Sequence, residues 1–232
     1  MNVGDYVYGA TAPRSWLHRL TEPLFVLSNV VFSAALYPVT LTTRVRWSPS
    51  PAGLAEYLKS RWRPLIYYSW HGNSWPSFIA FRSLPRALRP TAVAHDGAVS
   101  RVNARSGAWT GIDMLIFQRH AVASPREQIV AYVEKNRRHL MLFPDSGGPY
   151  RRLKPGMLEI ASELDAALVP FMVRARPEIT LGRTMRHLLP LPFGDLELRY
   201  ATPFAAAEAT IERCERSLAV LAAAPGQAAQ DS

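Results

Sequence analysis

A histidine stands where a short apolar run of the chain ends. The run 65–69 predicts a buried strand, and Trp70-His71-Gly72 follows it directly. The carboxyl ends of strands in α/β proteins line the crevice in which ligands bind. A histidine there has the proton affinity needed for a general base near neutral pH. The plainer alternative is a hydrogen-bonded structural histidine.

A second block of reactive and charged residues follows the apolar run 139–143. Its sequence passes from Pro144 through a Gly-rich turn to a group of cations, and the candidate residues are Asp145, Ser146, Gly147, Gly148, Arg151, Arg152 and Lys154. Glycines let backbone N–H groups approach an anion, and the cations supply charge for phosphate. Arg119, at the end of the run 114–118, is a further candidate phosphate ligand. The alternative is a plain turn with solvated surface charges.

Taken in order, these pieces resemble the glycerolipid and lysophospholipid acyltransferase superfamily over about residues 70–204. The matching blocks are the histidine motif, a Gly-x-x-Phe-Ile-x-Arg-like block at 111–119, a Phe-Pro-Glu-Gly-like block at 143–147 and an apolar strand ending in Val169-Pro170. A bacterial lysophospholipid-acyltransferase-like branch of that superfamily is the most similar subgroup. Short sequence motifs of that branch are matched by five segments of this chain: Trp70-His71-Gly72, Asp96-Gly97, Pro144-Asp145, Lys154-Pro155-Gly156 and Leu189-Pro190-Leu191-Pro192-Phe193.

The resemblance implies an enzyme of lipid metabolism and phospholipid biosynthesis. It would move a fatty acyl group from an acyl thioester, on coenzyme A or acyl carrier protein, to a hydroxyl or amine of a lysophospholipid-like or other lipid acceptor. His71 would be the base, and backbone N–H groups near Gly72 or Gly147 would stabilise the oxyanion. The resemblance implies no metal and no cofactor beyond the thioester co-substrate, and no nucleic acid partner.

The chain departs from the superfamily at the catalytic motif, which is His-x-x-x-x-Asp. Pro76 stands five residues after His71, where the carboxylate is expected. Without a carboxylate the imidazole lacks the group that fixes its tautomer and stabilises its charged form. Asp96 and Asp145, both at predicted strand ends, are the candidates to replace it. Ser146 also stands where the subgroup usually has glycine.

Two other functions remain open. The segment 145–149 copies the nucleophile motif of trypsin-like serine proteases, and His95 and Asp113 precede it in the order of that triad. The separations of 18 residues from His95 to Asp113 and 33 from Asp113 to Ser146 are too short for two six-stranded barrels. A serine hydrolase that uses Ser146 on another fold stays possible. The remaining alternative is a non-catalytic, lipid-binding protein of the membrane surface that has lost the dyad.

The elements that must position these residues alternate along the chain. Apolar runs predict strands at 65–69, 91–95, 114–118, 139–143, 167–173 and 196–201. Ser124-Pro125-Arg126-Glu127 predicts a capped helix start, with the helix running to about Arg137. Further helices are expected at 155–164 and 205–223. We therefore expect a single α/β domain with a mixed, mostly parallel sheet covered by helices.

Composition agrees with one compact domain. The chain has 232 residues, of which 48% are hydrophobic and 19% are charged, and this balance excludes a disordered chain. Its net charge is +9. Cys214 is the only cysteine, so neither an intramolecular disulfide nor a cysteine zinc site is possible. The excess of arginine favours acidic partners, although genomic base composition explains it equally well.

The segment 24–41 is uncharged, mainly apolar and flanked by arginines. It is marginal as a transmembrane span because it contains Ser28, Asn29, Ser33 and Pro38. We expect a helix that lies in the membrane interface, or else packs on the domain's own core. The expected organisation is a membrane-associating segment at 1–48, the acyltransferase-like α/β domain at 49–225 and a flexible tail at 226–232. The expected location is the cytoplasmic face of the inner membrane, peripheral or monotopic.

Overall fold

The computed structural model of the chain describes residues 37–50, 52–59, 62–96, 110–118, 121–145, 148–181 and 186–223. It also describes single positions between 23 and 34 and between 100 and 108. The predicted tail 226–232 lies outside the described residues, as do Arg119, Ser146 and Gly147.

A mixed, mostly parallel sheet forms the centre of the molecule, as the sequence predicts. Seven strands follow one another in the order β1-β9-β6-β2-β5-β3-β4, and β10 pairs with β6 beside this path. All pairs along the path are parallel except β6 with β9. The bounds are β1 Arg44–Ser48, β2 Leu65–Tyr68, β3 Pro90–His95, β4 Met114–Phe117, β5 His139–Leu142, β6 Ala167–Arg176, β9 Asp195–Tyr200 and β10 Phe204–Ala205.

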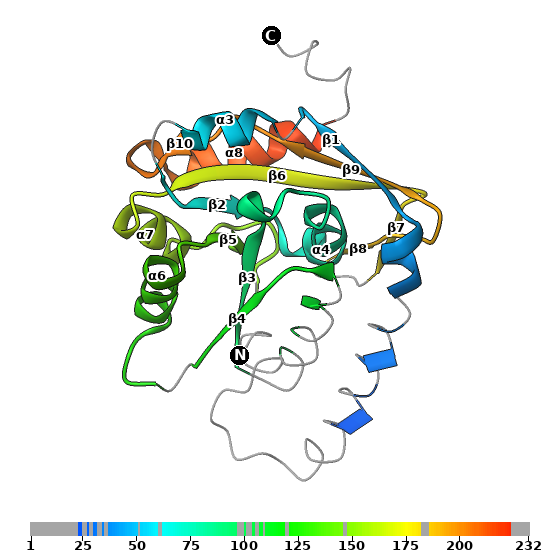
Figure 1. Cartoon of the computed structure of the whole chain (residues 1–232), viewed down its shortest axis with the longest axis horizontal. Coiled ribbons are helices and arrows are strands. Elements are labelled where there is room, and N and C mark those ends of the chain that lie inside the picture. Colours follow the sequence, from blue (N-terminus) through cyan, green and yellow to red (C-terminus); the bar gives the residue numbers. More distant parts are fainter. Residues whose placement is uncertain are drawn as a thin grey trace.

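A hairpin and several helices complete the fold. The hairpin pairs β7 (Ile179–Leu181) with β8 (His187–Leu189) outside the main sheet. The helices are α3 Ala52–Lys59, α4 Ser74–Phe81, α6 Pro125–Asn136, α7 Gly156–Glu163 and α8 Ile211–Ala222, with short 3-10 turns η1 His71–Asn73, η2 Arg86–Leu88 and η3 Ala206–Glu208. Figure 1 shows the long strand β6 crossing the middle of the molecule, with α6 and α7 on one side of the view and the β7–β8 hairpin on the other.

Both faces of the central strands are covered, because alternate residues enter two separate cores. In β2, Leu65 and Tyr67 join one apolar cluster, and Ile66 and Tyr68 join the other. The first cluster includes side chains of α3 and α4, whereas the second includes side chains of α6, α7 and α8. All four β2 residues are buried. A strand buried on both faces reads as a continuous apolar run, which is why the sequence identified it.

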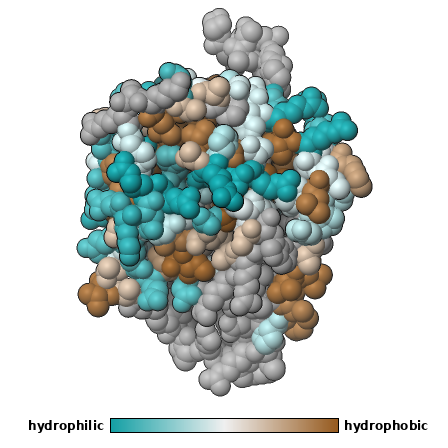
Figure 2. All heavy atoms as spheres, in the orientation of Figure 1, coloured by the Kyte–Doolittle hydropathy of each residue, from teal (hydrophilic) through white to brown (hydrophobic). Residues whose placement is uncertain are grey.

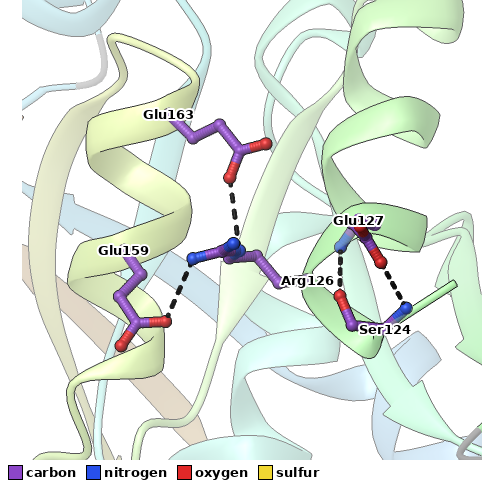
Figure 3. A network of polar contacts seen from close by, with 5 residues as sticks. All are labelled: Ser124, Arg126, Glu127, Glu159 and Glu163. Atoms are coloured by element: carbon purple, nitrogen blue, oxygen red, sulfur yellow. Dashed lines mark hydrogen bonds and ion pairs between the residues drawn. The ribbon is translucent and has the colours of Figure 1, made fainter.

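The helix at 125–136 begins as its sequence predicts. The Ser124 side chain accepts a hydrogen bond from the Glu127 N–H at 3.2 Å, and the Glu127 carboxylate accepts one from the Ser124 N–H at 2.5 Å. Pro125 occupies the first helical position. Figure 3 shows this capping box, and beside it Arg126 of α6 reaching Glu159 and Glu163 of α7.

Every described residue between 23 and 42 is helical, and this segment exposes apolar side chains. Leu24, Leu27, Val31 and Leu41 are among its exposed residues. Figure 2 shows hydrophobic residues gathered at the lower right of the molecule, where Figure 1 places this segment. In the part of the chain that the structure describes, no helix is long and apolar enough to cross a membrane.

Candidate active site

His71 and Asp145 meet at the carboxyl edge of the sheet because of strand register. Strands β2 and β5 are parallel neighbours, and Tyr68 is paired with Leu142. His71 lies three residues beyond Tyr68, and Asp145 lies three residues beyond Leu142. The two residues therefore leave the sheet side by side. The sequence predicted both at strand ends, and the register explains their proximity.

The Asp145 carboxylate is fully buried and is held by main-chain donors from two loops. One oxygen accepts a hydrogen bond from the His71 N–H at 2.7 Å, and the other accepts one from the Arg151 N–H at 3.2 Å. Burial raises the pKa of this carboxyl, while the two N–H donors and the charge of Lys154 oppose the rise. These hydrogen bonds fix the His71 backbone and close the loop after β5. The contacts described for the carboxylate are thus to main chain, whereas the sequence predicted a contact to the imidazole.

The His71 imidazole packs between two other rings. Its ring centroid lies 5.7 Å from that of Phe143 and 5.2 Å from that of His187, both in edge-to-face geometry. His187 is the first residue of β8, so the hairpin supplies one wall of the site. Among the described residues, neither the Nδ1 atom of His71 nor that of His187 has a hydrogen-bond partner, although both atoms are buried.

Both imidazoles are neutral near pH 7. Burial, with a smaller contribution from neighbouring His187, lowers the pKa of His71 to about 4. Burial also lowers the pKa of His187, while the negative charge of Asp145 opposes that shift. A neutral imidazole has an acceptor nitrogen, so His71 is in the form that a general base requires.

Asn73 anchors the short turn that carries His71. Its side-chain oxygen accepts a hydrogen bond from the Val173 N–H at 3.2 Å, and its amide nitrogen lies 3.7 Å from the Met172 sulfur. Ser69, just before the turn, also contacts that sulfur through its hydroxyl. These contacts tie η1 to β6, on the side of β2 away from β5. His71 is therefore held by both neighbouring strands.

The loop after β5 presents its cations to solvent. Arg151, Arg152 and Lys154 are all exposed. The Arg151 backbone has a φ of 55°, and its guanidinium lies 5.2 Å from the centre of the Tyr150 ring. The Leu153 N–H donates to the Glu215 carboxylate of α8 at 2.9 Å, which fixes the loop to the domain. The predicted cations thus lie on one anchored loop that begins beside His71.

The other predicted site residues fall in different places. Gly72 is buried inside η1, next to His71, and Gly148 adopts a φ of +77°, a conformation that favours glycine. Asp96 follows β3 at the same edge of the sheet, but β5 lies between β3 and β2. Adjacent strands are about 4.8 Å apart, so Asp96 leaves the sheet about 10 Å from the end of β2. Asp145 is the nearer carboxylate.

The parallel sheet is also incompatible with the architecture of a trypsin-like protease. Asp113 precedes β4 and contacts Arg138, which precedes β5, so both lie at the amino edge of the sheet. His95 ends β3, at the carboxyl edge. Those two members of the protease-like motif are therefore separated by the length of a strand. Among the described residues, no group of three or more His, Cys, Asp or Glu side chains could hold a metal ion.

Sequence reasoning did not predict that His187 belongs to this site. The hairpin that carries it is short, and its strands pair with each other outside the main sheet. His187 lies more than a hundred residues after His71, and no recognisable spacing links the two. The Asn73–Met172 anchor was missed for the same reason.

Comparisons with known proteins gave only a distant structural likeness. No family model matches the chain, and a search of curated proteins found no match. Among solved structures, the chain is similar to the crystal structure of the 1-acyl-sn-glycerophosphate (LPA) acyltransferase PlsC from Thermotoga maritima. The TM-score is 0.45 and the identity 12%, covering 94% of this chain and 83% of that one. A likeness at this level is too distant to carry an argument about activity.

Proposed function

We propose that this protein is an acyltransferase that acts on lipids. It transfers a fatty acyl group from an acyl thioester, on coenzyme A or acyl carrier protein, to a hydroxyl or amine of a lysophospholipid-like or other lipid acceptor. His71 takes the acceptor's proton as its oxygen or nitrogen attacks the thioester carbonyl. The proton then passes to the leaving thiolate, so no acyl-enzyme is required.

The observation that carries the proposal is the position and state of His71. It lies at the carboxyl edge of a mostly parallel sheet, where α/β proteins bind ligands, and it is neutral at physiological pH. Its backbone is fixed by Asp145, and Gly72 follows it in the same tight turn. The motif order described from the sequence adds the lipid acyltransferase resemblance to this geometry.

The exposed cations after β5 supply the phosphate-binding part of the proposal. Arg151, Arg152 and Lys154 are exposed on the loop whose Arg151 N–H shares the Asp145 carboxylate with the His71 N–H, and they would bind the phosphate of a lipid headgroup or of coenzyme A. Arg119 belongs to the same proposed set. Because such cations bind ground and transition states alike, Arg151→Ala should raise KM more than it lowers kcat.

The exposed apolar helix supplies the membrane part of the proposal. The lipid that accepts the fatty acyl group resides in a bilayer, so an enzyme acting on it must reach the bilayer surface. The described residues of 23–42 expose apolar side chains beside the domain, and Arg44 and Arg46 follow them. The proposed location is the cytoplasmic face of the inner membrane.

The direct test is an acyl-transfer assay with the full chain. Radiolabelled acyl-CoA and acyl-ACP are supplied with lysophospholipids in mixed vesicles, and the products are resolved by chromatography. Removing a general base should cost about 10²- to 10⁴-fold in kcat, so His71→Ala should be nearly inactive. Ser146→Ala is the matched control, and it should keep most of the rate.

The alternatives give different results in the same experiment. A serine hydrolase would lose activity in Ser146→Ala and would be labelled there by a fluorophosphonate probe. A non-catalytic lipid-binding protein would bind the vesicles but transfer no acyl group. A His71→Ala variant with wild-type acyl transfer would overturn the proposed mechanism.

A further inference from the structure

The His71 ring has another histidine where an acid–base catalyst ordinarily has a carboxylate. Pro76 removes the carboxylate expected on α4, and both Asp145 oxygens are occupied by backbone N–H groups. His187 packs edge-to-face on the His71 ring, with 5.2 Å between the ring centroids and 72° between the ring planes. The ring from β8, together with that of Phe143, therefore restricts the orientation of the His71 imidazole.

The two rings also share an uncommon polar feature. The buried Nδ1 atoms of both His71 and His187 have no hydrogen-bond partner among the described residues. Leaving a buried polar atom unpaired costs about 1–3 kcal/mol, so each such atom calls for an explanation, and a catalytic role is one. No hydrogen bond joins the two rings among the described contacts, so they are coupled by the ring contact and by charge, and both Nδ1 atoms stay available for a proton.

The surroundings of the pair allow one added proton but disfavour two. Among the described residues, the titratable groups that act on the pair are the two rings themselves and Asp145 from the loop after β5, and the Lys154 charge acts on Asp145 in turn. The η1 turn and α4 contribute no titratable group besides His71. A single positive charge on the pair faces the Asp145 carboxylate, whereas a second would repel the first.

We propose that His187 is the positioning residue of His71, and that the two imidazoles act as one unit that takes up a single proton. This inference rests on the proposed acyl transfer. The acceptor O–H or N–H bond breaks as the new bond to the acyl carbon forms, and the proton moves to His71. The contact with His187 holds the His71 ring in place while that ring carries the proton. The proton leaves to the thiolate as the C–S bond breaks, and both rings are neutral again.

A ring that only fills space can be replaced by another ring of the same size, whereas a ring that takes part in proton uptake needs its nitrogens. His187→Phe retains an aromatic ring of similar size but removes both nitrogens. We expect kcat to fall about 100-fold in this variant, the lower end of the general-base contribution, with KM changed less than threefold. Unchanged kcat in a folded His187→Phe protein would overturn the proposal.

Nitrogen NMR of histidine-labelled full-length protein supplies a readout that does not depend on activity. The chain has six histidines, which single substitutions assign. In the wild type, the nitrogen chemical shifts of His71 and His187 should titrate together, so that each residue's titration curve also shows the protonation step of the other residue. In His187→Phe the His71 signal should show one step, displaced to higher pH because the repulsion is gone. Independent titrations in the wild type would overturn the pair.

Matched variants separate this inference from the proposed function. His139→Asn replaces another buried histidine, at the opposite edge of the sheet, and should leave the His71 titration unchanged. His187→Gln provides the same NMR reading if His187→Phe does not fold. If the full chain transfers no acyl group but the two histidines titrate as a pair, the proposed function fails and the pair stands. If acyl transfer requires His71 but not His187, the pair fails and the function stands.

Discussion

Asp145 supports the site through hydrogen bonds to the backbone of its neighbours. Its carboxylate accepts hydrogen bonds from the backbone of His71 and from that of Arg151, and it is completely buried. A buried carboxylate is costly unless hydrogen bonds compensate it. Here the compensation comes from the two loops that form the site. The buried Asp145 carboxylate therefore holds together the loop that carries His71 and the loop that carries Arg151.

We predict that Asp145→Asn destabilises the protein and lowers activity together. The amide has one acceptor oxygen, so its NH₂ group would face a backbone N–H donor. Losing a charge-assisted bond and leaving that donor unpaired should lower the free energy of unfolding by about 2–3 kcal/mol. Urea denaturation measures the change. Asp113→Asn is the control: its ion pair with Arg138 is exposed, and the expected loss is under about 1 kcal/mol. Equal losses in the two variants would contradict the assigned role.

At the scale of elements, all six apolar runs that predicted strands form strands in the structure, namely β2, β3, β4, β5, β6 and β9. β2, β5 and β6 read as continuous apolar runs, and their predicted bounds agree with the structure to within a few residues. Strand β1 was not predicted, although Arg44–Ser48 alternates polar and apolar residues. Its partner β9 follows about 150 residues later, and the pairing of such distant segments is not encoded locally. The place of His187 beside His71 could not be predicted for the same reason, because the two residues are distant in the sequence.

The last helix shows how a capping residue overrides a composition-based boundary. The Ala-rich sequence predicted a helix from 205, but α8 begins at Ile211. The Thr210 hydroxyl accepts a hydrogen bond from the Arg213 N–H at 3.1 Å and fixes the start there. Residues 206–208 form a separate 3-10 turn. The cap was present in the sequence and is a stronger signal than helix propensity.

At the start of α6, the cap should matter more than the ion pairs beside it. Ser124→Ala should lower the free energy of unfolding by about 1 kcal/mol, because it leaves the Glu127 N–H without its acceptor. Arg126→Ala removes both contacts to α7, yet its side chain is 49% exposed and the expected loss is under about 0.5 kcal/mol. Thermal unfolding of the two variants under one condition compares them. A larger loss for Arg126→Ala would reverse the interpretation.

His139 makes the alignment of two strands dependent on pH. It begins β5, and its Nδ1 accepts the N–H of Leu65, the first residue of β2, at 3.1 Å. Burial lowers the pKa of His139 to about 4, opposed by a hydrogen bond to the Ala87 backbone. Protonation would place a second donor against the Leu65 N–H. The folded state thus excludes a proton that the unfolded state accepts.

We predict that this histidine contributes stability that is complete above pH 6.5 and is lost as pH falls towards 4. In that interval the unfolded chain binds the proton and the folded chain does not, so the free energy of unfolding decreases by up to about 3 kcal/mol. His139→Asn keeps an acceptor near the same position but does not titrate. Denaturation from pH 7.5 to 4.5 should show a shallower decline in the variant. Parallel declines would exclude His139 as a source.

At the scale of the whole molecule, the proposed base and the exposed apolar helix are linked through the hairpin region. The Phe193 N–H, in the loop after β8, donates to the Thr42 hydroxyl at the end of the helical segment at 3.1 Å, and the Arg44 N–H donates to the Gly194 carbonyl at 3.0 Å. The same hairpin places His187 against His71. Figure 1 shows β7 beside the end of this helix. A bilayer bound to the helix would therefore lie at a fixed position relative to the site.

The last prediction concerns that helix as a membrane-binding element. Leu24, Leu27 and Val31 follow one another at spacings of three and four residues, the spacing of one helical face, and these three residues and Leu41 are all exposed. A helix with such a face binds lipid interfaces, and nearby arginines add attraction to anionic lipid. The full chain should sediment with vesicles containing phosphatidylglycerol, and Val31→Asp should weaken this at least tenfold, since it puts a charge into the apolar face. Val220→Asp is the matched control, because Val220 on α8 is 64% exposed against 60% for Val31. Equal weakening by both substitutions, or no vesicle binding by the wild type at low salt, would show that this face is not the one that meets the membrane.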